Sequence, residues 1–233
     1  MNKIHSSISK VCDIHVLDFV KKPEDIVAIS NEHNFRSIVT VPGYIHRFKK
    51  SLLSIPILGT KPNLTPIINY PLGCESSKSR IYSIIDAKEN NLKEVEIIAP
   101  YHHIFAKDFR AIDEDLTDIV KTCEKVGISF KYILDLYIPL DVKTRNRVLR
   151  IISTHDIPII SFGSGYNMDY DISSSDIVLN VMKMKDKINS KVKVVLRNTD
   201  NIVDEMNVLM KCGVDIIGVN WNYSTKLINN NKN

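Results

Sequence analysis

Short apolar runs alternate along the chain with longer stretches in which apolar residues recur at helical spacing. The short runs are rich in valine and isoleucine. Several are apolar on both faces of the pleat, as expected of parallel strands covered by helices. We therefore predict strands at residues 13–18, 37–41, 66–70, 95–99, 131–135, 157–161, 192–196 and 214–219.

The amphipathic stretches predict helices between these strands. Pro23 with Glu24 and Asp25 is typical of a first helical turn, and Gly213 is typical of a residue just past a helix end. We predict further helices at residues 75–90, 113–126, 141–153, 173–187 and 200–212.

Eight strands that alternate with helices predict an α/β fold, the (β/α)8 TIM barrel. The chain has 233 residues and no linker rich in proline and glycine, so it fits a single domain. We assign residues 1–227 to this barrel and expect the asparagine-rich tail at residues 228–233 to be disordered.

Composition argues against several functional classes. Hydrophobic residues make up 44% of the chain and charged residues 25%, which is ordinary for a globular protein with a continuous core. The net charge of +4 is mild and the lysines lie among acids, so we expect no nucleic-acid partner. No apolar run approaches the ~20 residues of a membrane helix, and the cysteines form no CxxC pair. We therefore expect a cytoplasmic protein with reduced thiols and no membrane partner.

Five segments resemble, in order and spacing, motifs of the deoxyribose-phosphate aldolase family. The sharpest match is Tyr-Pro-Leu-Gly at residues 70–73. The others are Asp-Ile-His-Val-Leu at 13–17, Val-Pro-Gly-Tyr at 41–44, Glu-Val-Glu-Ile-Ile at 94–98 and Lys-Tyr-Ile-Leu-Asp at 131–135. The resemblance spans residues 13–221. It implies a TIM-barrel aldolase that acts on 2-deoxyribose 5-phosphate, forms a homodimer and needs no cofactor.

The resemblance also implies which acidic residues line the active site. Asp13, Glu96 and Asp135 stand at acidic positions of the family, and His15 stands at a threonine position. Buried carboxylates are costly unless they are paired, protonated or bound to a cation. We expect Arg197 to be their partner, because it has the strand parity of residues that face the barrel interior.

The family's two lysines are absent from the positions that the resemblance assigns to them. The lysine that forms the Schiff base falls on Ser161, and the second lysine falls on Val195 when residues are counted back from Gly213. The family's phosphate-contacting glycines and serines are replaced at residues 198–199 and 220–222.

These losses bear directly on catalysis, because a Schiff base needs a lysine amine that is neutral often enough to attack a carbonyl. Serine and valine cannot supply one. Lys131 and Lys193 begin their predicted strands, so we expect them near the opposite, stability end of the barrel. The sequence thus predicts an aldolase-like barrel without lysine chemistry. An ε-ammonium group beside Glu96 would overturn this interpretation.

Three functions stay open at this point. The protein is a binding or structural relative of the aldolases, an active lyase with altered residues, or a barrel that binds another small phosphorylated or carbonyl ligand. The candidate ligand-binding residues are Arg197, His15, Ser164 and Gly165. The interior polar residues also fit a closed hydrogen-bonded network with no further role. The His-His pair at residues 102–103 is expected on an extended loop and predicts no metal site.

Overall fold

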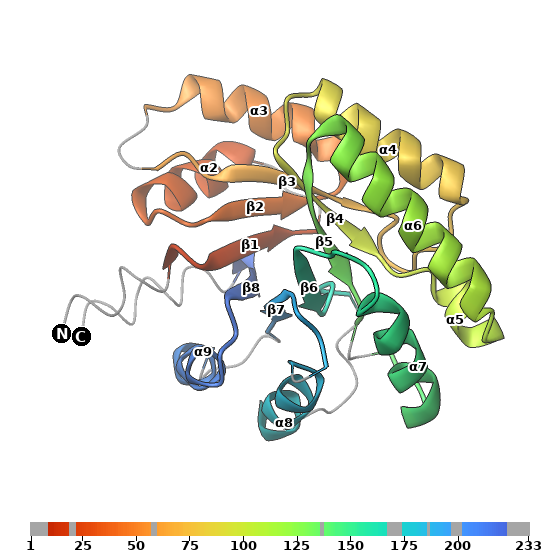
Figure 1. Cartoon of the computed structure of the whole chain (residues 1–233). Coiled ribbons are helices and arrows are strands. Elements are labelled where there is room, and N and C mark those ends of the chain that lie inside the picture. The colour runs from red at the N-terminus through yellow and green to blue at the C-terminus, as the bar shows by residue number, and fades with distance from the viewer. Residues whose placement is uncertain are drawn as a thin grey trace.

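The computed structural model describes residues 9–18, 22–56, 60–135, 138–166, 174–185, 187–196 and 202–222. Within these residues, eight parallel strands close into one barrel in chain order, and helices surround it (Figure 1). The strands are β1 (Cys12–Val16), β2 (Ser37–Thr40), β3 (Asn63–Ile68), β4 (Glu94–Ile98), β5 (Ser129–Ile133), β6 (Ile159–Phe162), β7 (Lys191–Val195) and β8 (Ile216–Asn220). The predicted single-domain (β/α)8 TIM barrel is therefore confirmed. The expected tail at residues 228–233 lies outside the described residues.

The helices lie on the outside of the barrel, where they cover the outward faces of the strands (Figure 1). They are α2 (Pro23–Glu32), α3 (Ile45–Ser54), α4 (Ser77–Glu89), α5 (Tyr101–Ala106), α6 (Phe109–Val126), α7 (Val142–Ile152), α8 (Ser174–Lys185) and α9 (Ile202–Lys211), with a short 3-10 turn at Pro42–Tyr44. The apolar core lies between the two layers and is built mainly from isoleucine, valine and leucine. The side chains that face the barrel interior form a different set.

The prediction of β3 was wrong at its start. The strand begins at Asn63, and its register pairs Ser37 with Asn63 and Thr40 with Pro66. Pro66 lies inside the strand, although a proline has no N–H to donate to the ladder. The ends of the other strands differ from the predicted ends by two residues or fewer, which is the usual uncertainty of element boundaries.

The structure contains two helices that the sequence pattern did not predict. One is α3, which follows β2. The other is α5, which holds His102 and His103 where an extended loop was expected. Pro100 precedes α5 and its carbonyl accepts the first helical bond from Ile104, while Lys107 in the left-handed conformation ends the helix. The centroids of the two histidine rings lie 4.0 Å apart on this helix.

Alternate residues of each barrel strand face the interior. On β1 these are Asp13 and His15, and the register places Asp13 beside Ser37 on one side and Gly218 on the other. Glu96 of β4 lies beside Lys131 of β5 in the same way. The barrel closure therefore brings charged residues from distant parts of the chain into one interior layer.

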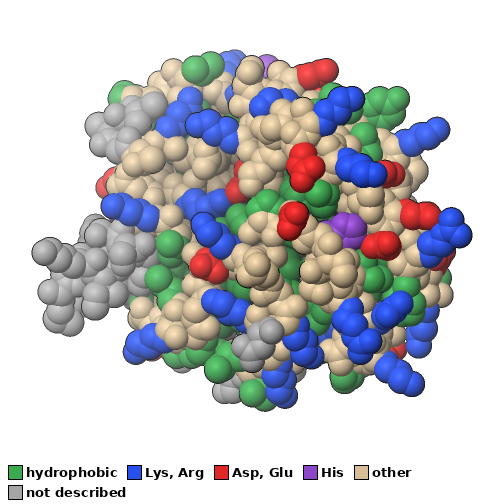
Figure 2. Space-filling model, in the orientation of Figure 1, with side chains coloured by type: hydrophobic (Ala, Val, Ile, Leu, Met, Phe, Trp, Pro, Cys, Tyr) green, Lys and Arg blue, Asp and Glu red, His purple; other side chains and the backbone are tan. Residues whose placement is uncertain are grey.

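The outer surface is charged and mixed in sign. Figure 2 shows lysines and arginines dispersed among acidic residues over the visible face, and they form no continuous basic stripe there. In the part of the chain that the structure describes, no helix is long and apolar enough to cross a membrane.

Candidate functional site

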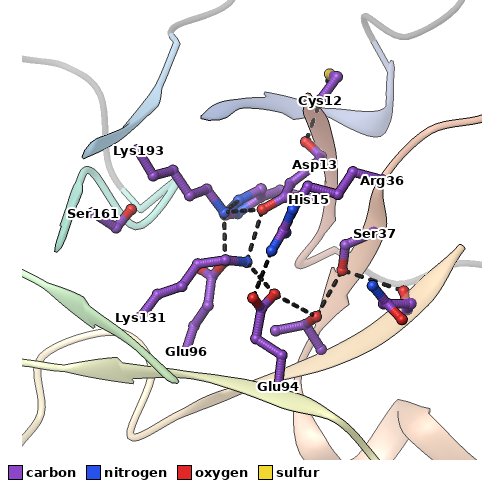
Figure 3. Close-up of polar contacts among 12 residues, drawn as sticks. Cys12, Asp13, His15, Arg36, Ser37, Glu94, Glu96, Lys131, Ser161 and Lys193 are labelled. Atoms are coloured by element: carbon purple, nitrogen blue, oxygen red, sulfur yellow. Dashed lines mark hydrogen bonds and ion pairs between the residues drawn. The ribbon is translucent and has the colours of Figure 1, made fainter. Parts of the chain in front are cut away.

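A cluster of charged side chains fills the centre of the barrel (Figure 3). We call it the charged core cluster. Its members are Asp13, Arg36, Glu94, Glu96, Lys131 and Lys193. They come from five parts of the barrel, namely β1, β4, β5, β7 and the residue before β2. If every member is ionised, the three cations balance the three carboxylates named here.

Lys193 makes the central contacts of the cluster. Its Nζ lies 2.9 Å from Asp13 Oδ2 and 2.8 Å from His15 Nε2, and it also donates to Glu96 Oε1. The side chain is fully buried. An ammonium group has three protons, so each proton of Lys193 has an acceptor within the barrel.

Lys131 is held in the same manner by three carboxylates. Its Nζ lies 2.8 Å from Asp13 Oδ2, 2.8 Å from Glu94 Oε1 and 2.8 Å from Glu96 Oε1. Burial disfavours the charged amine, but the negative charges of Asp13, Glu96 and Glu94 outweigh it and raise the pKa of Lys131 well above its ordinary value. Lys131 is therefore an ammonium ion at neutral pH.

These contacts correct two expectations drawn from the sequence. Lys131 and Lys193 do not lie at the stability end of the barrel, because β5 begins at Ser129 and β7 at Lys191, so each lysine is the middle residue of its strand. They also supply the cations that balance Asp13 and Glu96, a role that was assigned to Arg197. Arg197 itself lies outside the described residues.

Arg36 was missed by the sequence analysis. It immediately precedes β2 and extends beneath the barrel, where its Nη1 lies 2.7 Å from Asp13 Oδ1 and its Nη2 lies 2.5 Å from Glu94 Oε2. Its side chain is 20% exposed, whereas the two lysines are not exposed at all. Arg36 thus closes the cluster at the solvent side, and no local sequence signal marks this role.

The cations hold the interior carboxylates in their ionised form. Burial alone would raise the pKa of Glu96, but Lys131 and Lys193 outweigh it and lower that pKa to about 2. Burial is likewise outweighed at Asp13, where Lys131, Lys193 and Arg36 hold the pKa well below its usual value. The cluster is therefore a set of buried ion pairs and not a set of protonated acids.

His15 lies above the cluster, on the side of the barrel where the strands end. We call that end the mouth. Burial and the charge of Lys193 lower the pKa of His15 to about 3, so its ring is neutral at physiological pH. Its Nδ1 and the second oxygen of Glu96, Oε2, are buried atoms without a hydrogen-bond partner in the described part of the chain. The candidate site therefore has unused hydrogen-bonding capacity around Lys193.

Ser161 and Val195, the positions to which the resemblance assigns the family's two lysines, are both buried. Ser161 is buried on β6, beside Lys193 in the register, and its Oγ donates to the Gly163 carbonyl at 3.1 Å. Figure 3 shows Ser161 to one side of the cluster, with no contact drawn to the charged residues. Val195 is buried on β7 beside Gly218. Neither residue presents an amine.

Asp135 lies at the mouth, just beyond the end of β5, and is not part of the charged core cluster. Its Oδ2 accepts hydrogen bonds from the Ser164 amide at 3.0 Å and from Ser164 Oγ at 2.5 Å. The sequence analysis offered Ser164 and Gly165 as ligand-binding residues. Both donors of Ser164 are taken by a carboxylate of the protein, and the ligand-binding role of these residues stays a prediction.

Metal binding has little support in the described residues. They contain no group of three or more histidine, cysteine, aspartate or glutamate side chains that is arranged to hold a metal ion. Of the expected site residues, the structure brings together Asp13, His15 and Glu96 and places Asp135 apart from them. Their catalytic roles stay predictions.

Comparison with known proteins finds several deoxyribose-phosphate aldolases that are similar to this chain. No known family model matches the chain. The deoxyribose-phosphate aldolase of Clostridioides difficile is 23% identical over 216 residues, which cover 91% of this chain and 91% of that protein. The deoxyribose-phosphate aldolase of Desulfitobacterium hafniense is 22% identical over 204 residues, which cover 84% of this chain and 88% of that protein. Among solved structures, the deoxyribose phosphate aldolase of Aeropyrum pernix, described as having a unique tetrameric structure, has a TM-score of 0.78 at 18% identity. The match covers 98% of this chain and 92% of that chain.

Proposed function

The chain is a distant relative of the deoxyribose-phosphate aldolases, as its motifs indicated, and we propose that it does not cleave 2-deoxyribose 5-phosphate through a lysine Schiff base. Its barrel serves a binding role, with the charged core cluster as a rigid support beneath the mouth. The observation that supports this proposal is how the amines of Lys131 and Lys193 are held inside the barrel. Both are fully buried, and both have an acceptor for each proton.

The interpretation drawn from the sequence, a barrel with no interior amine, is overturned, because the amines of Lys131 and Lys193 lie beside Glu96. The premise drawn from the sequence was wrong on that point. Schiff-base formation requires a neutral amine that a carbonyl carbon can approach. The carboxylates around Lys131 raise its pKa, so its neutral form is rarer than that of a free lysine. Catalytic lysines of this kind are usually shifted in the opposite direction.

Two features in the described part of the mouth disfavour a phosphorylated sugar. Ser161 and Val195 stand where the resemblance places the family's lysines. The hydroxyl and amide of Ser164, a candidate ligand-binding residue, donate to Asp135. The negative charge of Asp135 disfavours a phosphate nearby. These contacts support binding of a ligand other than 2-deoxyribose 5-phosphate.

A direct test measures consumption of 2-deoxyribose 5-phosphate by proton NMR. We expect the substrate signals to decay no faster with the protein than in buffer. The aldolase of Clostridioides difficile, assayed in parallel, serves as the positive control. Decay that is faster than the buffer rate and scales with the concentration of this protein would overturn the proposal.

A second candidate function, a lyase that uses Lys193, is favoured by one specific observation. Lys193 combines an amine, the carboxylate of Glu96 and a neutral imidazole within hydrogen-bond distance, which is a plausible set for proton transfer. The two candidates differ in the behaviour of matched variants. If the protein is active, Lys193→Met should abolish turnover. Lys131→Met should change it less, because Lys131 does not contact His15.

A further inference from the structure

The layer of helices around the barrel is open between α3 and α4, which are neighbours in that layer (Figure 1). Helix α2 packs against α3, and α4 packs against α6, but α3 and α4 make little contact with each other. On β3, Thr65 faces the interior, where it bonds Ser37, so Leu64 and Pro66 face outward. Both line cavities between the two helices, and the barrel wall is therefore the floor of this opening.

One of these cavities lies at the end of the barrel opposite the mouth, and we call it the lower cavity. It has a volume of about 350 Å³ and lies between the second half of α3, the start of β3 and the turn after α4. Its apolar lining includes Leu52, Leu53, Leu64 and Leu92. Leu53 is 82% exposed, so one apolar wall is open to solvent. The volume is sufficient for a small organic molecule.

Three lysines line the same cavity, namely Lys49, Lys61 and Lys93, and none of the ten lining residues is acidic. Lys49 Nζ donates to the carbonyl of Asn90 at 2.9 Å, which leaves two of its three protons for another acceptor. The ammonium groups of Lys61 and Lys93 form no ion pair or hydrogen bond with the residues that the structure describes. Positive charge therefore gathers at an apolar cavity without a carboxylate to balance it.

The helix ends oppose this positive charge but do not cancel it. Helices α3 and α4 both end beside the lower cavity, and a helix C-terminus carries about half a negative charge. The two ends thus offset about one of the three lysine charges, and Lys49 already binds the carbonyl of Asn90 at the end of α4. The net local charge stays positive, which favours an anion.

The amines and the leucines select for a ligand with two different parts. An inorganic anion would gain from the lysines, but it would leave the leucine walls in water. An uncharged hydrocarbon would cover the leucines and leave the amines without a partner. A molecule that joins an anionic group to a short hydrocarbon chain uses both kinds of lining residue.

We propose that the lower cavity binds a small amphipathic anion, in which a carboxylate contacts the lysines and a short hydrocarbon chain packs against the leucines. The site lies at the opposite end of the barrel from the mouth. The inference therefore goes beyond the proposed function and does not depend on it. Binding is noncovalent, and no bond in the ligand is made or broken.

Isothermal titration calorimetry of the full chain tests this inference with three probes, octanoate, 1-octanol and inorganic phosphate. We expect octanoate to bind saturably at one site. Octanol should bind at least about tenfold more weakly because it lacks the charge, and phosphate equally so because it lacks the chain. A tenfold difference corresponds to about 1.4 kcal/mol, which is less than the burial of two methylene groups provides.

Matched variants place the binding in the lower cavity. The double variant Lys61→Gln/Lys93→Gln should weaken octanoate binding at least about tenfold. Lys50→Gln is the control, because Lys50 is also an exposed lysine on α3 but does not line the cavity, and its affinity should change less than about twofold. Leu53→Ser should weaken octanoate binding at least about threefold. All four side chains are exposed, so the variants should fold, and circular dichroism checks this.

Three outcomes of the titrations would each overturn the inference. They are no saturable binding of octanoate, equal binding of phosphate, and an octanoate affinity that the double lysine variant leaves unchanged. Co-sedimentation with phosphatidylglycerol vesicles in place of octanoate binding would assign the lysines to a membrane surface and would also overturn it. Turnover of 2-deoxyribose 5-phosphate is a separate measurement, so failure of one proposal does not imply failure of the other.

Discussion

Replacing Lys193 with methionine removes one buried cation and keeps most of the side-chain volume. In the folded protein, Lys193 contacts Asp13 at 2.9 Å and also pairs with Glu96 and His15. The variant leaves Glu96 and Asp13 to share Lys131 and gives the charged core cluster an excess of one negative charge. It also leaves His15 Nε2 without its donor.

The expected loss of stability follows from these contacts. A pair of unit charges 4 Å apart interacts by about 4 kcal/mol at an effective dielectric constant of about 20, so two contacts give about 8 kcal/mol. Removal of the lysine also removes the several kcal/mol that its own burial costs. The net loss should be about 3–5 kcal/mol, the range seen when one member of a buried pair is deleted. Since domains are stable by only about 5–15 kcal/mol, Lys193→Met should fold with little stability to spare.

Urea denaturation followed by circular dichroism measures this loss. The double variant Lys193→Met/Glu96→Gln restores the charge balance. Its loss of unfolding free energy should be about 1–3 kcal/mol smaller than the sum of the losses in the two single variants. Arg110→Ala is the matched control, because Arg110 forms an exposed pair with Glu114 at 2.8 Å and should show no change beyond experimental scatter. A Lys193→Met variant as stable as the Arg110 control would refute the view that these buried pairs hold the barrel interior together.

Three further predictions concern the site and its assembly. The pKa of His15 is lowered from 6.5 to about 3, so below pH 6.5 the unfolded chain binds a proton that the folded protein does not. Folding stability should therefore fall by up to about 1.4 kcal/mol per pH unit between pH 6 and pH 4. His15→Gln should remove that part of the slope in urea titrations across this range, and an unchanged slope would contradict it. Gly218→Ala would place a Cβ 2.9 Å from His15 Nε2 and 3.1 Å from Lys193 Cε, so we expect a loss of about 1–3 kcal/mol, whereas Gly43→Ala meets no atom within 4 Å and should be neutral. The family resemblance predicts a homodimer, which light scattering tests, and a monomer mass at micromolar concentration would refute that prediction.

The fold was predictable because the spacing of apolar residues shows itself within short segments of the sequence. Short apolar runs located the strands, and this inference needs only the spacing of residues along one strand at a time. The family resemblance placed Asp13 and Glu96 inside the barrel, where the structure shows both side chains buried.

The charged core cluster was not predictable in the same way. Lys193 lies one inward position before Val195, and its long side chain reaches the centre of the barrel from that lower layer. A comparison of motifs assigns each function to one position in the sequence. It therefore does not detect a lysine whose long side chain reaches the centre of the barrel from a neighbouring inward position. Arg36 precedes its strand, and its two carboxylate partners are 23 and 58 residues away, so only barrel closure reveals the contact. The contact between His15 Nε2 and Lys193 Nζ likewise joins two residues that are 178 positions apart in the sequence.

Trapping with borohydride tests the central claim most directly. The protein is incubated with 2-deoxyribose 5-phosphate, reduced with sodium borohydride and weighed intact by mass spectrometry. Any imine between a lysine and the substrate becomes a stable covalent adduct under these conditions. If the interior amines are held by carboxylates as described, the mass stays that of the unmodified chain. A stoichiometric adduct that maps to Lys193 or Lys131 would contradict the account.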